Sequence, residues 1–100
     1  MAWMIVSHDS ERGPQIRADR RVMDAHWQYE LSHRHLIVTS GSLREDDGVT
    51  KIGSLLVLDV STRAEAEAIF ANDPATLAGL RGETQLRWLN VAILDRREQP

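Results

Sequence analysis

The sequence predicts an α+β domain in which strands and helices follow one another in the order βαββαβ. Three observations support this: four apolar runs rich in strand-forming residues, two segments of helical periodicity between them, and a length of 100 residues, which suits a single hydrophobic core. This order is typical of the ferredoxin-like arrangement, an antiparallel sheet with both helices on one face. We therefore expect one domain over residues 1–95 and a polar C-terminal tail over residues 96–100.

The first strand and the first helix are predicted from the opening third of the chain. Residues 2–8 (AWMIVSH) form an apolar run that ends at the polar stretch DSERG, which indicates a strand. Between residues 16 and 34, apolar side chains recur at helical spacing and charged side chains occupy the opposite arc, which indicates an amphipathic helix. The apolar residues of this pattern are Ile16, Val22, Met23, Trp27 and Leu31.

The middle of the chain predicts a β-hairpin. HLIVTSG (35–41) and KIGSLLVLDV (51–60) have the composition of strands. The polar stretch SLREDDGVT (42–50) between them contains Gly48, a residue suited to a turn, and we expect it to connect the two strands.

The second helix and the last strand follow this hairpin. Thr62 and Glu65 have the spacing of a capping box, and strong helix formers continue to Asn72. The Asp-Pro pair at residues 73 and 74 then opens a short turn or helix over residues 74–80. ETQLRWLNVAIL (83–94) is predicted to be the last strand.

Two of the predicted strands are apolar on both faces. In residues 54–60 and 89–94, apolar side chains occupy both alternating sets of positions, although two helices can cover only one face of a sheet. The simplest remedy is a second copy of the chain packed against the open face. We therefore expect a homodimer formed through the sheet face, with a small-molecule site between the sheets or at the helix edge.

The composition excludes several classes of partner and location. A net charge of −3 gives no broad attraction to nucleic acid or to anionic lipid. The N-terminal apolar run is too short for a signal peptide or a membrane span, so we expect a cytoplasmic protein without a membrane partner.

Neither a metal site nor a cofactor is expected. The chain has no cysteine, and the His-x-His pair of His33 and His35 straddles a helix-to-strand junction without a third ligand at a suitable spacing. The acidic stretch SLREDDG lacks the alternating oxygen ligands and closing glutamate of a calcium loop.

His26 is the first candidate for chemistry. A helical wheel points it inward, on the same arc as Val22, Met23 and Tyr29. The polar residues on that arc are Asp19, Glu30 and His33. An inward histidine can be a hydrogen-bonded core residue, or it can act as a general acid or base because imidazole titrates near neutrality. The sequence leaves both interpretations open.

Asp73 is the second candidate. Aspartate before proline is a favoured helix start, because the carboxylate accepts free backbone N–H groups. A capping carboxylate has a second oxygen, which could face His26, and Asp19 and Glu30 are alternative partners for that ring. Ser40, Gly41 and Ser42 could cradle an anion through backbone N–H groups. The tryptophans at 3, 27 and 88 are expected in the core or an interface, or as the wall of a pocket for a flat ligand.

The order of these residues resembles the YCII-related family, whose fold is a dimeric ferredoxin-like α+β barrel. MDAHWQYEL (23–31) resembles the family's first-helix histidine motif, with His26 at the histidine. SHRHLIVTSGSL (32–43) is similar to the strand that follows, with Gly41 at its glycine turn. The Asp-Pro motif falls on Asp73 within residues 52–80, and RWLNVAI (87–93) resembles the closing strand, with Trp88 near the pocket.

The resemblance implies an enzyme that uses a histidine and an aspartate, since one type of member is a dehydrochlorinase acting on a chlorinated hydroxyhydroquinone. We therefore expect a cofactor-independent lyase or isomerase of a small cyclic or aromatic substrate, with His26 and Asp73 as its acid/base pair. The residues expected to bind substrate are Tyr29, Ser40, Gly41, Ser42 and Trp88. The alternative is a non-catalytic dimer that binds a metabolite or a regulatory partner in the same cavity.

Two positions depart from the family's pattern. Ser42 stands where a proline commonly follows the glycine, and Ala75 stands where an aromatic residue commonly follows Asp-Pro. The smaller Ala75 is expected to widen the pocket, so the resemblance does not identify the substrate.

Overall fold

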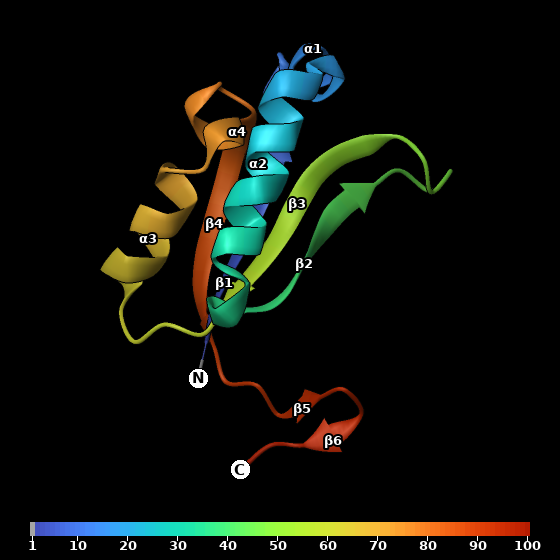
Figure 1. The fold of residues 1–100 in the computed structure, drawn as a ribbon. Coiled ribbons are helices and arrows are strands. Elements are labelled where there is room, and N and C mark those ends of the chain that lie inside the picture. Colours follow the sequence, from blue (N-terminus) through green and yellow to red (C-terminus); the bar gives the residue numbers. More distant parts are fainter. Residues whose placement is uncertain (1) are drawn as a thin grey trace.

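Four antiparallel strands form the sheet of this protein in the order β2-β3-β1-β4. A computed structural model describes residues 2–100. The strands are β1 (Ala2–Asp9), β2 (Ile37–Arg44), β3 (Lys51–Leu58) and β4 (Arg81–Leu89). Helices lie on one face of the sheet: α1 (Gly13–Ala18), α2 (Arg20–Ser32), α3 (Arg63–Ala71) and α4 (Pro74–Leu77) (Figure 1). The predicted α+β fold with helices on one face is confirmed.

The first predicted helix is divided in two. The structure begins α1 at Gly13, ends it at Ala18 and starts α2 at Arg20. Asp19 separates them because its backbone is extended and its side chain accepts hydrogen bonds from the N–H groups of Arg21 and Val22. A capping aspartate inside an amphipathic pattern therefore marks a boundary that the periodicity alone does not show.

The connections before and after β2 are short. A single 3₁₀ turn, η1 (Arg34–Leu36), joins α2 to β2. Strand β2 continues to Arg44, past the predicted end of its strand, and the turn before β3 is closed by Asp47, which accepts from the N–H groups of Val49 and Thr50. Gly48 has a φ of 71° there, a left-handed conformation that glycine adopts without steric strain because it has no Cβ atom.

Thr62 and Glu65, the residues of the predicted capping box, hold the start of α3 through the N-cap bond and a contact between their side chains. Thr62 is the N-cap residue, its Oγ1 accepts from the Glu65 N–H at 3.2 Å, and the same hydroxyl donates to the Glu65 carboxylate at 2.9 Å. The helix ends one residue before the expected Asn72, which is its C-cap.

Two apolar clusters lie between the sheet and the helices. A polar layer, which contains the buried residues Ser7 and Asp73, separates them. The larger cluster is centred on Ile5, Leu58, Val60, Ala66 and Leu86 under α3. The smaller cluster joins Ile16, Ala75 and Leu80 at the end where α1 and α4 meet. Ser7 is 1% exposed and lies on the same face of β1 as Ile5, so the polar layer crosses the helix-covered face of the sheet.

The C-terminal segment differs from the prediction. Strand β4 ends at Leu89, whereas the sequence pattern continues the strand to residue 94. The rest of the chain turns away from the sheet and folds on itself, with β5 (Ile93–Leu94) paired to β6 (Arg97–Glu98) (Figure 1). Asp95 and Arg96 link them with φ values of 51° and 65°, the conformation of a tight two-residue hairpin turn. The apolar run over residues 89–94 does not reveal that the chain leaves the sheet after Leu89.

None of the helices in residues 2–100 has the length and apolar character needed to cross a membrane.

Candidate active site

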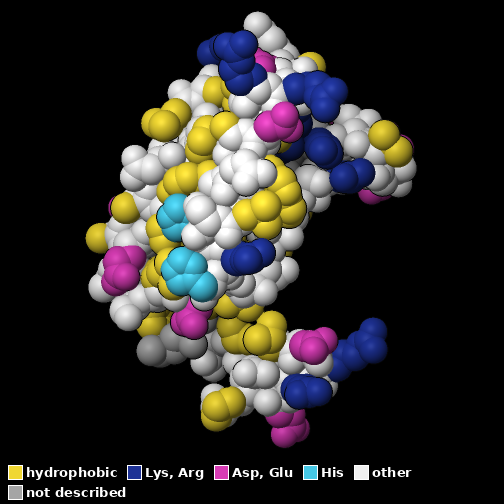
Figure 2. Space-filling model, viewed as in Figure 1, with side chains coloured by type: hydrophobic (Ala, Val, Ile, Leu, Met, Phe, Trp, Pro, Cys, Tyr) yellow, Lys and Arg dark blue, Asp and Glu magenta, His cyan; other side chains and the backbone are white. Residues whose placement is uncertain are grey.

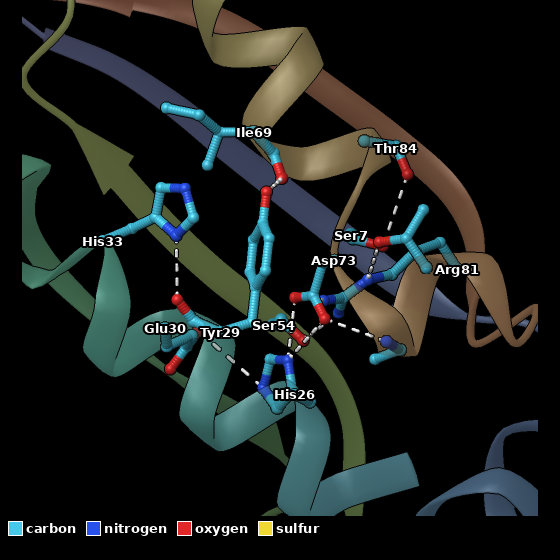
Figure 3. A network of polar contacts seen from close by, with 12 residues as sticks. Ser7, His26, Tyr29, Glu30, His33, Ser54, Ile69, Asp73, Arg81 and Thr84 are labelled. Atoms are coloured by element: carbon cyan, nitrogen blue, oxygen red, sulfur yellow. Dashed lines mark hydrogen bonds and ion pairs between the residues drawn. The ribbon is translucent and has the colours of Figure 1, made fainter.

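His26 and Asp73 meet in the polar layer, although 47 positions separate them in the chain. The Nδ1 atom of His26, on α2, lies 2.9 Å from Oδ1 and 2.8 Å from Oδ2 of Asp73, directly before α4 (Figure 3). Carboxylate oxygens only accept hydrogen bonds, so the ring proton of a neutral His26 is placed on Nδ1. The Nε2 atom of that tautomer is then a free proton acceptor.

Asp73 also caps α4. Its Oδ1 accepts a hydrogen bond from the Ala75 N–H at 2.9 Å, and Pro74 occupies the first helical position. The residue is 4% exposed, and its carboxylate is held from both sides, by the ring of His26 and by the Ala75 N–H. The two interpretations that the sequence left open for Asp73, a helix cap and a partner for an imidazole, are both realised by one carboxylate.

Arg81 is a third member of this site, and it is not among the residues that the sequence pattern predicts there. Its Nη2 lies 3.3 Å from Oδ2 of Asp73, and its Nη1 donates to Ser54 Oγ at 2.7 Å. The guanidinium also lies 4.8 Å from the centre of the Phe70 ring. Burial lowers the pKa of Arg81 and the charge of Asp73 raises it, so this cation depends on its carboxylate partner.

A row of small hydroxyl residues supports these side chains from the sheet. Ser7 pairs with Ser54 on β3 and with Thr84 on β4, so the three lie side by side on the helix-covered face. Thr84 Oγ1 is 3.3 Å from Ser7 Oγ (Figure 3). A sequence signal exists for this layer: serine at positions 7 and 54 interrupts the inward apolar set that contains Ile5 and Leu56.

The alternative partners of His26 have other positions. Asp19 caps α2 and does not contact the ring. The Oε1 atom of Glu30 lies 3.8 Å from His26 Nε2, which is too long for a hydrogen bond but places a second carboxylate beside the free ring nitrogen.

A cavity of about 330 Å³ opens beside His26, between α2 and the strands β2 and β3. Three of the predicted binding residues line it, Ser40, Gly41 and Ser42. The remaining lining residues are Arg17, Met23, Trp27, Glu30, Lys51 and Ser54. One helix face and one sheet edge therefore surround the ring that Asp73 holds.

Two residues predicted to bind substrate lie outside this cavity. The Tyr29 hydroxyl donates to the Ile69 carbonyl at 2.8 Å and so ties α2 to α3; burial and the nearby Asp73 charge raise the pKa of this phenol. Trp88 packs edge-on against Trp3 with ring centres 5.1 Å apart. Trp3 lies four positions from Ser7 along β1. At the rise of a strand this puts the tryptophan pair about 13 Å from the hydroxyl row.

Ala75 does not have its expected effect. It is fully buried in the smaller apolar cluster with Ile16 and Leu80, and it does not line the cavity. A small residue at this position therefore fits between α4 and its neighbours α1 and α2 and leaves the cavity width unchanged.

His33 and His35 do not combine into a metal site. The Nδ1 atom of His33 lies 2.9 Å from the Tyr29 carbonyl oxygen, to which its N–H donates, and its ring packs against that of Tyr29 at 4.3 Å. Within residues 2–100, no three His, Cys, Asp or Glu side chains are grouped as a metal site requires.

The comparisons with known proteins give a family from a sequence model and a fold from a solved structure. The model of the family described as the YCII-related domain matches residues 1–89. Among solved structures, 5-chloro-2-hydroxyhydroquinone dehydrochlorinase (TftG) of Burkholderia phenoliruptrix, in complex with 2,5-dihydroxybenzoquinone, is 26% identical with a TM-score of 0.77. The match covers 90% of this chain and 94% of that one.

A second structure, of a protein from Agrobacterium tumefaciens, is 18% identical with a TM-score of 0.48 over 87% of this chain and 89% of that one. No curated protein matches the sequence.

Proposed function

Because this chain belongs to the YCII-related family, whose domain covers residues 1–89, we propose that it is a cofactor-independent lyase or isomerase acting on a small cyclic or aromatic substrate. One observation carries the proposal. The imidazole of His26 is held through Nδ1 by both oxygens of Asp73, at 2.9 and 2.8 Å, and the same ring lines a cavity. A general base needs this combination of a fixed tautomer and an accessible second nitrogen.

His26 is the proton acceptor in this scheme. Its Nε2 takes a proton from a hydroxyl of the ring's keto tautomer, in which the carbon that bears the leaving group is tetrahedral. The O–H electron pair then forms a carbonyl, and the displaced π pair expels a group such as chloride with its bonding pair. Asp73 keeps Nδ1 protonated beforehand and stabilises the imidazolium afterwards. In the lyase reaction the proton then passes from Nε2 to solvent, so H⁺ and the leaving group are lost together. In an isomerisation no group leaves and the proton returns to another atom of the substrate. Neither reaction consumes an oxidant or reductant.

Arg81 positions the carboxylate in this scheme. Asp73 has only two oxygens for a ring nitrogen, a backbone N–H and a guanidinium, and the contact at 3.3 Å with Arg81 compensates its buried charge. The side chains of Arg81 and Asp73 are 8% and 6% exposed, so water screens this pair weakly.

The cavity suits a small ring. A volume of about 330 Å³ is at the lower end of the range for ligand sites. Trp27, which is 55% exposed, and Met23 give it apolar surface, while Ser40, Ser42 and Ser54 give it hydroxyl groups. The similar dehydrochlorinase acts on a ring of this size, which supports the same substrate class here.

Chloride release from 5-chloro-2-hydroxyhydroquinone is the assay that tests the proposal. His26→Ala should lower kcat about 100-fold to 10,000-fold, the usual contribution of a positioned acid or base. Asp73→Asn should also lower kcat, by about 100-fold, because its amide can still cap α4 but presents the ring with a different partner. Circular dichroism should show both variants folded.

A His26→Ala protein with full activity would exclude the acid/base pair. A protein that binds the ring compound without turning it over would instead be the non-catalytic binding module, the second function that this fold permits.

A further inference from the structure

Lys51 is the only lysine in the sequence, and it lines the candidate cavity at the start of β3. The residue is exposed, and its ammonium group makes no ion pair or side-chain hydrogen bond with any residue in the range 2–100. It is therefore a positive charge at the cavity without a partner in this part of the chain.

The other cations at this site are already engaged. Arg17 holds both oxygens of Asp9, at 2.6 and 2.9 Å, and donates to the Gly53 carbonyl at 3.1 Å. Arg81 is bound to Asp73 and Ser54 behind the imidazole and does not line the cavity. A negatively charged ligand would thus meet one available cation among the described lining residues, the ammonium of Lys51.

The other lining groups define the rest of the ligand. Trp27 presents an exposed flat ring, which suits an aromatic or quinonoid ring. Dark blue basic side chains also gather over α1, the beginning of α2 and the nearby β2–β3 arm (Figure 2). These side chains place positive charge on this side of the molecule, although the net charge of the chain is −3 and Glu30 also lines the cavity.

We infer that the ligand of this cavity is an acidic ring, with an ionised oxygen substituent that Lys51 binds while the ring lies against Trp27. This inference rests on the proposed function and adds the charge of the substrate to it. Lys51 is a binding residue in this scheme, so its loss raises KM and Kd more than it lowers kcat.

The test uses two ring compounds of similar size, one that ionises to an anion and one that stays neutral. The acidic probe is 2,5-dihydroxybenzoquinone, and the neutral probe is 2,5-dimethoxybenzoquinone, which has no acidic hydroxyl. Calorimetry should show that Lys51→Met raises the Kd of the acidic probe about tenfold, as expected for loss of a charge-assisted contact. The Kd of Lys51→Arg for the same probe should stay within about threefold of that of the natural protein.

Arg21→Met is the matched control, because it removes the same charge from an exposed position of α2 that does not line the cavity. The neutral probe should bind all of these proteins alike. The inference is overturned if Lys51→Met and Arg21→Met bind the acidic probe equally well, or if the natural protein shows no preference for the acidic probe over the neutral one.

A second measurement uses the uniqueness of Lys51. Reductive methylation with ¹³C-formaldehyde keeps the positive charge and labels only this side chain and the N-terminal amine. The dimethyllysine signal should shift on titration with 2,5-dihydroxybenzoquinone and stay unchanged with the dimethoxy compound; an unshifted signal contradicts the contact.

The variant His26→Ala separates this inference from the proposed function. If binding of the acidic probe still depends on Lys51 in a protein that shows no turnover, the acidic-ring site is retained and the catalytic role fails. If His26 proves essential for turnover but Lys51→Met leaves KM unchanged, the catalytic role is retained and the acidic-ring site fails.

Discussion

Asp73 shows how one carboxylate can organise a site. Its two oxygens contact the ring of His26, the Ala75 N–H and the guanidinium of Arg81 while the residue is 4% exposed. Buried charges are tolerated only when they are paired and hydrogen-bonded, so each contact depends on the others. The residues that position the imidazole therefore also hold α4 and β4 together.

Replacing Arg81 should reveal this dependence. Arg81→Met leaves the charge of Asp73 buried without its cation, and we expect the free energy of unfolding to fall by about 3 kcal/mol, measured by urea denaturation. The matched control is Arg63→Met, which breaks an ion pair with Glu67 whose side chains are 54% and 56% exposed. That change should cost less than about 1 kcal/mol.

Equal losses for the two arginine variants would contradict this account. Adding Asp73→Asn to Arg81→Met should recover part of the stability, because the double variant no longer buries an unpaired charge.

At the scale of elements, the passage of β3 beside β1 leaves no room for a side chain at Gly53. Gly53 lies opposite His8, and a Cβ built on Gly53 would be 2.4 Å from the Ser7 carbonyl oxygen. The same glycine accepts a hydrogen bond from Arg17 through its carbonyl. This close passage places Ser54 and Ser7 side by side under the His26 pair.

We expect Gly53→Ala to be disruptive and Gly41→Ala to be tolerated. The added methyl group at Gly53 meets backbone atoms that cannot move away, which should cost about 2–3 kcal/mol of unfolding free energy. At Gly41, on the neighbouring strand, no atom lies within 4 Å of the place that the methyl group would take, so the change should be within about 1 kcal/mol. Thermal unfolding of both variants measures the difference, and similar midpoints would refute the close-packing argument.

At the scale of the whole molecule, one face of the sheet is covered and the other is not. Val6 and Leu55 are paired neighbours that alternate with inward residues, so they point away from the helices, and both are half-buried. The C-terminal hairpin projects from the same body and leaves a hollow beside it (Figure 2). We propose that a second copy of the chain packs on this open face, as the apolar pattern of the strands led us to expect.

Light scattering should therefore give twice the chain mass of 11.3 kDa. Leu55→Glu should yield a folded monomer, because glutamate on the open face is solvated in the monomer but buried in the dimer. Ala64→Glu, an equal change of charge at an exposed position of α3, should leave the dimer intact. A monomeric natural protein, or a Leu55→Glu dimer, would contradict the proposal.

The sequence alone determined the order of elements, the start of α3 at Thr62, the cap at Asp73 and the inward face of α2 that carries His26. Each of these depends on residues within one or two helical turns or along one strand, where spacing predicts geometry. The break at Asp19 was available from the same local rules but was hidden by the longer periodicity.

Only the tertiary structure decided which groups meet. The 2.8 Å contact between His26 and Asp73, the insertion of Arg81 beneath them and the distance of Trp88 from the cavity all depend on how β1 aligns with β3 and β4. Sheet register and helix packing join segments that are far apart in the chain, and many such pairings satisfy the same local pattern. Burial of the apolar clusters on both sides of the polar layer selects one of them, and that selection assembles the candidate site.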